Sequence, residues 1–190
     1  MTLRQRLARR LLRLVGWRTD GEPPTPHRFV LIAAPHTSNW DFPLMMLMAF
    51  ETGLSIHWLG KESLFRGPMG WFLKRLGGVP VERTEPNRLV AQMADVFAEQ
   101  DDFALVVPPE GTRSRSDHWK SGFYRIAHGA DVPILCSYLD YSTKVGGFGP
   151  LITPTGDVRA DMEPIRAFYA DKHGRYPDQK SDIRLRDEAS

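Results

Sequence analysis

The chain has 190 residues, of which 42% are hydrophobic and 25% are charged. These values are typical of a globular protein and exclude a disordered or low-complexity chain. The length suits one well-buried domain and is short for two. The single cysteine, Cys136, excludes an intramolecular disulfide and is interpreted as a buried thiol in the core.

The net charge of +2 conceals a strongly basic amino end. Residues 1–18 contain six arginines and no acid, so the rest of the chain sums to −4. Apolar residues recur there at helical spacing, namely Leu3, Leu7, Leu11, Leu14 and Val15. A basic amphipathic helix of this kind suits the surface of an anionic membrane. Two alternatives stay open, which are a helix packed on the domain and an arm that binds nucleic acid.

This segment is neither a membrane span nor a signal peptide. Arginines interrupt it every few residues, whereas a spanning helix needs an unbroken apolar run. A signal peptide needs an apolar core and a cleavage site of small residues. The sequence therefore predicts a peripheral membrane contact over residues 1–18.

After residues 19–27, which have the composition of a linker, apolar strands alternate with helical patterns. The expected strands are 29–34, 55–60, 79–81, 103–107 and 133–138, followed by a hairpin over 144–158. The expected helices are 41–52, 68–76, 86–100, 121–129 and 161–173. This alternation predicts an α/β fold, a single domain over 28–177 with a mostly parallel mixed sheet flanked by helices. Residues 178–190 are charged and are expected to form a flexible tail.

The first chemically distinctive loop follows strand 29–34. His36 lies in this loop and Asp41 opens the next helix. In open α/β folds, ligands bind at the carboxyl ends of the strands. A neutral imidazole there can take a proton from a hydroxyl when a carboxylate holds its other nitrogen. The pair alone is weak support, because a histidine and an aspartate five residues apart also occur in ordinary turns near helix starts.

The second distinctive loop follows strand 103–107 and contains Glu110, Gly111, Thr112 and Arg113. Backbone N–H groups beside a glycine and a planar guanidinium are suited to hold a phosphate. Further cations could come from Arg83, Lys61 and Lys120. The alternative is that each of these cations lies on the surface or pairs with a nearby carboxylate.

With these residues in place, the chain resembles the glycerolipid acyltransferase family, whose best-known members are the lysophosphatidic acid acyltransferases. The family's H-x-x-x-x-D motif matches His36 to Asp41. Its second block matches Lys61-Glu62 and then Gly78 to Arg83, and its P-E-G-T-R-S motif is complete at residues 109–114. The fourth block, an apolar strand that opens with proline, matches Pro133. Four blocks in the right order make this resemblance specific.

The resemblance implies a glycerol-3-phosphate acyltransferase-like fold and the transfer of a fatty acyl group to a lipid hydroxyl. The donor would be acyl-CoA or acyl carrier protein, and the acceptor a lysophospholipid, foremost 1-acyl-sn-glycerol 3-phosphate, in phospholipid biosynthesis. His36 would be the general base and Asp41 would orient it. The acceptor and its phosphate would be bound by Arg83, Glu110, Gly111, Thr112 and Arg113. Further contacts would come from Lys61, Lys120 and Pro133.

The resemblance also sets expectations about partners and place. No cofactor is expected beyond the acyl thioester as co-substrate, and no metal site or nucleic-acid partner is expected. The amino-terminal helix would hold the protein on anionic phospholipids, at the cytoplasmic face of the membrane. The alternatives are an acyltransferase for another lysolipid or hydroxylated lipid, or a non-catalytic lipid-binding protein of the same fold. An esterase would need a nucleophilic serine, and the chain has no G-x-S-x-G motif.

Overall fold

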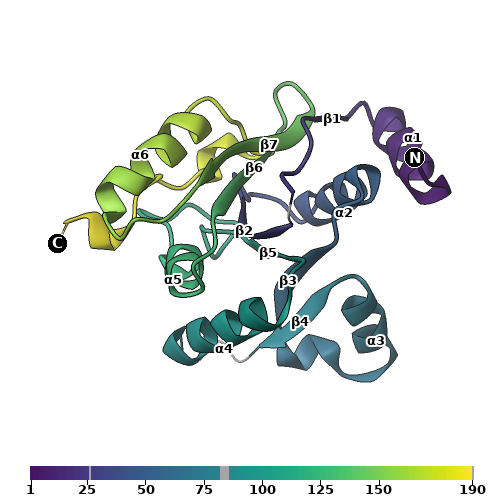
Figure 1. The fold of residues 1–190 in the computed structure, drawn as a ribbon. Coiled ribbons are helices and arrows are strands. Elements are labelled where there is room, and N and C mark those ends of the chain that lie inside the picture. The colour runs from purple at the N-terminus through teal and green to yellow at the C-terminus, as the bar shows by residue number, and fades with distance from the viewer. Residues whose placement is uncertain (26, 82–85, 190) are drawn as a thin grey trace.

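The structure is a computed structural model that describes residues 1–25, 27–81 and 86–189. Within these ranges the chain forms a seven-stranded sheet in the order β1-β7-β6-β2-β5-β3-β4 (Figure 1). The strands are β1 (Arg18–Asp20), β2 (Arg28–Ala33), β3 (Ile56–Lys61), β4 (Gly78–Val81), β5 (Phe103–Val107), β6 (Ile134–Asp140) and β7 (Val145–Ile152). All neighbouring strands pair in parallel except β6 and β7, which form an antiparallel hairpin. The predicted single α/β domain with a mostly parallel mixed sheet is confirmed.

Helices cover both faces of this sheet (Figure 1). The helices are α1 (Leu3–Leu14), α2 (Asp41–Thr52), α3 (Gly67–Arg75), α4 (Pro86–Glu99), α5 (Gly122–Gly129) and α6 (Val158–Tyr169), with short 3₁₀ turns η1 (Glu62–Phe65), η2 (Pro177–Gln179) and η3 (Arg186–Ala189). Helices α4, α5 and α6 lie on one side, whereas α2 and α3 lie on the other, with α1 outside α2 (Figure 1).

Strand β2 shows why both faces need this cover. Its side chains alternate between the two faces, as in any pleated strand. Phe29 and Leu31 are buried in the core on the α2 side, and Val30 and Ile32 in the core on the side of α4, α5 and α6. A strand that is apolar on both faces is typical of a parallel sheet between two helical layers.

Helix α1 packs on the domain, but not through its leucine stripe. Ala8, Leu12 and Trp17 are buried, and Leu12 and Trp17 pack against residues of α2. Arg9 of α1 forms an ion pair with Glu51 of α2 at 2.7 Å. The stripe remains solvent-exposed, with Leu3 83% exposed. The packing alternative therefore holds for one side of α1, while the stripe expected to meet a membrane remains open to solvent. No helix in the described ranges combines the length and apolar character needed to cross a bilayer.

Three segments differ from the sequence-based expectation. The hairpin expected over 144–158 is instead the single strand β7, which pairs antiparallel with β6. Residues 19–27, expected to be a linker, include the end of the edge strand β1, which pairs with β7. The tail, expected to be loose from residue 178, packs on the domain over its described part. Leu185 is buried and its backbone forms a bridge with Trp119. The tail packs because Leu185, although surrounded by charged residues, buries its apolar side chain against the core.

Candidate active site

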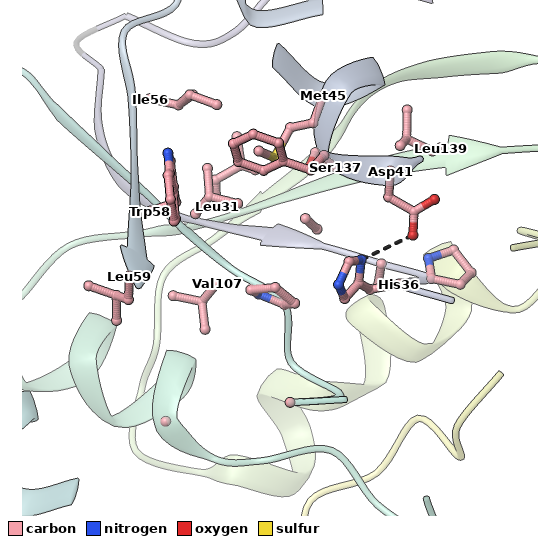
Figure 2. A pocket seen from close by; sticks show the side chains of 18 of the residues that line it. Leu31, His36, Asp41, Met45, Ile56, Trp58, Leu59, Val107, Ser137 and Leu139 are labelled. Atoms are coloured by element: carbon pink, nitrogen blue, oxygen red, sulfur yellow. Dashed lines mark hydrogen bonds and ion pairs between the residues drawn. The ribbon is translucent and has the colours of Figure 1, made fainter. Parts of the chain in front are cut away.

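The loop between β2 and α2 brings His36 and Asp41 together at the carboxyl edge of the sheet. The His36 Nδ1 atom lies 3.0 Å from Asp41 Oδ2 (Figure 2). The backbone N–H groups of Thr37 and Ser38 donate to the same oxygen, each at 3.0 Å. A carboxylate only accepts hydrogen bonds, so Nδ1 carries the ring proton and Nε2 is left with a free lone pair. The loop therefore presents an oriented imidazole base.

Tyr141 completes this arrangement and was not anticipated from the sequence. Its hydroxyl donates to Asp41 Oδ1 at 2.7 Å, so both carboxylate oxygens are held. Burial and this hydrogen bond raise the pKa of Tyr141 well above its usual range, so the phenol stays a neutral donor. Tyr141 directly follows β6, which is the neighbour of β2. The position of Tyr141 after an apolar strand was the only signal for it, and using that signal required the strand order.

Glu110 holds the same loop from the other side. The residue is 1% exposed, and its Oε2 accepts the backbone N–H of His36 at 2.7 Å. Burial raises the pKa of Glu110 to about 7, although the hydrogen bond from His36 opposes this shift. Glu110 does not line the cavity described below. The carboxylate faces the backbone of His36, which gives Glu110 a positioning role, and its expected contact with the acceptor stays a prediction.

The rest of the loop after β5 faces the cavity. Gly111, Thr112 and Arg113 line it together with Lys120 and His36. The Arg113 guanidinium donates a hydrogen bond to Asn39 Oδ1, which joins the loops after β2 and β5. Three basic side chains, Arg113, Lys120 and Arg125, therefore line the same cavity as the imidazole.

Gly111 is required at its position for two reasons. Its φ of 68° lies in the left-handed region, which other residues rarely adopt. A Cβ atom there would also lie 3.1 Å from Lys120 Cγ. The glycine therefore lets the loop turn directly over the Lys120 side chain.

Two other predicted residues, Pro133 and Lys61, do not line the cavity. Pro133 precedes β6, and its carbonyl accepts the N–H of Val30 near the start of β2. Because β6 and β2 run parallel, Pro133 lies at the edge opposite His36, and its expected substrate contact stays a prediction that this position does not favour. Lys61 ends β3, is exposed and does not line the cavity. Arg83 lies outside the described residues.

A cavity of about 1420 Å³ includes His36 and is lined by residues of α2 on one face of the sheet and of α4 and α5 on the other. Figure 2 shows the His36–Asp41 pair at one end and apolar side chains beyond it. The labelled apolar lining residues are Leu31, Met45, Ile56, Trp58, Leu59, Val107 and Leu139. Such a lining suits a hydrocarbon chain, with polar groups at one end to fix its orientation. Within the described ranges, no group of three or more histidine, cysteine or acidic side chains is arranged to hold a metal ion.

A family model described as Acyltransferase matches residues 18–139. This chain belongs to the acyltransferase family. The match covers His36, Asp41 and the loop after β5, so the motifs identified from the sequence lie within the family's own domain. The predicted family membership is confirmed.

The chain is also similar to two individual acyltransferases. It is 29% identical over 117 residues to a 1-acyl-sn-glycerol-3-phosphate acyltransferase of Streptococcus pneumoniae, covering 62% of this chain and 43% of that protein. The chain therefore spans less than half the length of this curated relative. The crystal structure of the 1-acyl-sn-glycerophosphate acyltransferase of Thermotoga maritima matches with a TM-score of 0.58 at 19% identity. The match covers 88% of this chain and 73% of that one, and it shows that the two proteins share a fold.

Proposed function

We propose that this acyltransferase moves a fatty acyl group from a thioester to the free hydroxyl of a lysophospholipid. The observation that carries the proposal is the His36–Asp41 pair at the polar end of an apolar cavity. The donor is acyl-CoA or acyl carrier protein, and the acceptor is 1-acyl-sn-glycerol 3-phosphate. The name of the Streptococcus pneumoniae relative supports this acceptor, and the reaction would serve phospholipid biosynthesis.

The geometry supports a direct transfer. The Nε2 atom of His36 takes the proton of the acceptor hydroxyl while the hydroxyl oxygen attacks the thioester carbonyl carbon. Asp41 stabilises the imidazolium that forms. The carbon–sulfur bond then breaks, and the leaving thiolate takes the proton from His36. The products are the ester and the free thiol, and no acyl-enzyme forms.

Arg113 and Lys120 are the proposed partners of the acceptor phosphate. Both line the cavity that contains His36, and a guanidinium can bind two phosphate oxygens at once. Gly111 and Thr112, in the same loop, are proposed to contact the acceptor as well. The apolar part of the cavity would hold an acyl chain.

The membrane surface is the proposed place of reaction, because the acceptor is a bilayer lipid. The exposed leucine stripe and the arginines of α1 support this location. Anionic phospholipids would attract the arginines and the leucines would enter the boundary between headgroups and chains.

The first test removes the base. Full-length His36→Ala, assayed in detergent with acyl-CoA and 1-acyl-sn-glycerol 3-phosphate, should lose transfer by about 100- to 10,000-fold, the usual worth of general-base catalysis. Asp41→Asn should also lose activity, because the amide cannot hold the ring in the same way. A folded His36→Ala protein that kept more than about a tenth of the wild-type rate would contradict the proposal.

The second test concerns the phosphate. Arg113→Ala should raise KM for 1-acyl-sn-glycerol 3-phosphate by about 10- to 150-fold, the worth of a hydrogen bond to a charged group, and should change KM for acyl-CoA little. A panel of lysolipids measured beside it identifies the acceptor. Equal effects on both substrates, or preference for an acceptor without a terminal phosphate, would point to another lysolipid or lipid alcohol.

A further inference from the structure

Helix α3 exposes most of its apolar side chains. Four large apolar residues of η1 and α3 are exposed, namely Leu64, Met69, Trp71 and Phe72. Trp71, at 68% exposed, is among the most open large apolar residues of the described chain. On α3 itself only Gly70 is buried, and it packs against the backbone of Phe65. Several large apolar side chains exposed within nine residues are a feature of surfaces that bind a partner.

The charges around this surface favour an anionic partner. Residues 61–75 carry four basic side chains and one acid. Lys61, Arg66, Lys74 and Arg75 are all exposed. The Arg75 guanidinium carbon lies 5.9 Å from the centre of the Trp71 ring. Tryptophan beside arginine is a pairing found at membrane interfaces, where the ring sits among headgroups and the cation meets phosphate.

This surface, defined by Leu64, Met69, Trp71 and Phe72, lies on the same side of the molecule as α1. Figure 1 shows α2 between α1 and α3. A chain of ring contacts links α2 to η1. Phe42 of α2 meets Trp58 at 5.1 Å, and Trp58 meets Phe65 at 5.8 Å. The α1 stripe and this surface therefore belong to helices that flank α2 on one side of the sheet.

The cavity connects this surface with the imidazole. Leu64 of η1 and Leu73 of α3 line the same cavity as His36. Leu64 also belongs to the exposed surface. An apolar path therefore leads from the face of α3 to the reacting groups.

We propose that η1 and α3 form a second membrane contact, which docks on an anionic phospholipid bilayer together with α1. A second copy of the chain fits less well, because a symmetric dimer through this surface would oppose like basic clusters. The proposal rests on the proposed function only in taking the acceptor lipid to lie in that bilayer. Two contacts on either side of α2 would orient the cavity toward the lipid.

The test measures vesicle binding without any acyl substrate. Full-length protein and its Trp71→Ser/Phe72→Ser variant are sedimented with equimolar phosphatidylglycerol and phosphatidylcholine vesicles. Neither side chain lines the cavity, and both are exposed, so the variant should fold and should transfer acyl groups normally in detergent. The variant should bind vesicles at least about tenfold more weakly, because a tryptophan and a phenylalanine no longer enter the interface. The matched control is Leu151→Ser, an exposed leucine on β7, which should bind as the wild type does.

A labelling experiment places the contact directly. Cys136 is fully buried, so an introduced surface cysteine is the thiol that reacts with an environment-sensitive fluorophore. The label on Phe72→Cys should shift to the blue with anionic vesicles, whereas the label on Leu151→Cys should not. Vesicle binding unchanged by the serine substitutions, or equal responses of both labels, would overturn the proposal. So would a wild-type dimer that the serine substitutions convert to monomer, because a second copy would then cover the surface. If the wild-type protein transferred no acyl group, the proposed function would be wrong, but vesicle binding and the fluorophore response would still test the membrane contact.

Discussion

His36 is held from three directions by groups that lie far apart in the sequence. Its Nδ1 atom is hydrogen-bonded to Asp41, and its backbone N–H donates to the Glu110 carboxylate. The Tyr141 hydroxyl donates to the second carboxylate oxygen of Asp41. These groups follow β2, β5 and β6 in the chain, and those three strands are adjacent in the sheet. A base that is oriented in this way loses little freedom when substrate binds, which is how positioning contributes to rate.

Replacing Tyr141 tests this positioning. Tyr141→Phe removes one hydrogen bond to a carboxylate, which is worth about 1.5–3 kcal/mol when complete. We expect kcat to fall by roughly tenfold or more, with KM for both substrates little changed. The measurement is steady-state kinetics in detergent, with thermal unfolding as a check of the fold.

A matched control separates positioning from stability. Tyr124 also donates from its hydroxyl to a buried aspartate, Asp161, at 2.6 Å, but neither residue lines the cavity. Tyr124→Phe should lower the unfolding temperature and leave kcat of the folded protein unchanged. If Tyr141→Phe behaved like this control, the role of Tyr141 would be structural alone.

Helix α1 has one side that packs on α2 and another that exposes the leucine stripe. The buried side of α1 meets α2, and Trp17 packs edge-on against Tyr141 with ring centres 4.9 Å apart. Removing residues 1–18 would therefore uncover core side chains and the support of Tyr141. Substitutions confined to the exposed stripe test membrane contact without this damage.

The triple variant Leu3→Ser/Leu7→Ser/Leu14→Ser should keep the wild-type unfolding temperature, because all three leucines are exposed. It should bind phosphatidylglycerol-containing vesicles at least about tenfold more weakly, since each buried leucine is worth about 1.5–3 kcal/mol. Sedimentation with vesicles measures the binding. Leu12→Ala is the contrasting change, because Leu12 is 1% exposed and its loss should cost about 2–5 kcal/mol of stability. Unaltered vesicle binding by the triple variant would exclude the stripe as a membrane contact.

For the whole molecule, the buried Glu110 links folding to pH. The pKa of Glu110 rises from 4.5 to about 7 on folding, so the folded state holds more protons between these values. Stability from this group is therefore complete below about pH 4.5 and is lost as pH rises through about 7. The loss is on the order of 3 kcal/mol at most, from the size of the shift.

Glu110→Gln isolates this contribution, because the amide oxygen can still accept the His36 N–H but does not ionise. The variant should gain stability relative to the wild type as pH rises from 5 to 8. Urea unfolding at both values measures the difference. A difference between the two proteins that stays constant over this range would contradict the assigned pKa of Glu110.

Local sequence patterns predicted most of the elements and one half of the site. The apolar run 103–107 coincides with β5, and the helix expected over 41–52 coincides with α2. The spacing of apolar residues indicates which side of a helix or strand is buried. It can be recognised from the sequence because the residues involved are close together in the chain. The spacing of His36 and Asp41 could be read for the same reason, because a single turn joins them.

Only the tertiary structure decided how separate elements meet. Strand order put β6 beside β2, which brought Tyr141 to Asp41 and sent Pro133 to the opposite edge. The fold buried Glu110 and set its carboxylate against the backbone N–H of His36. The side of α1 that packs on α2 was decided by the partners Leu44 and Met48. None of these outcomes follows from a local period, because each depends on contacts between segments that are distant in the sequence.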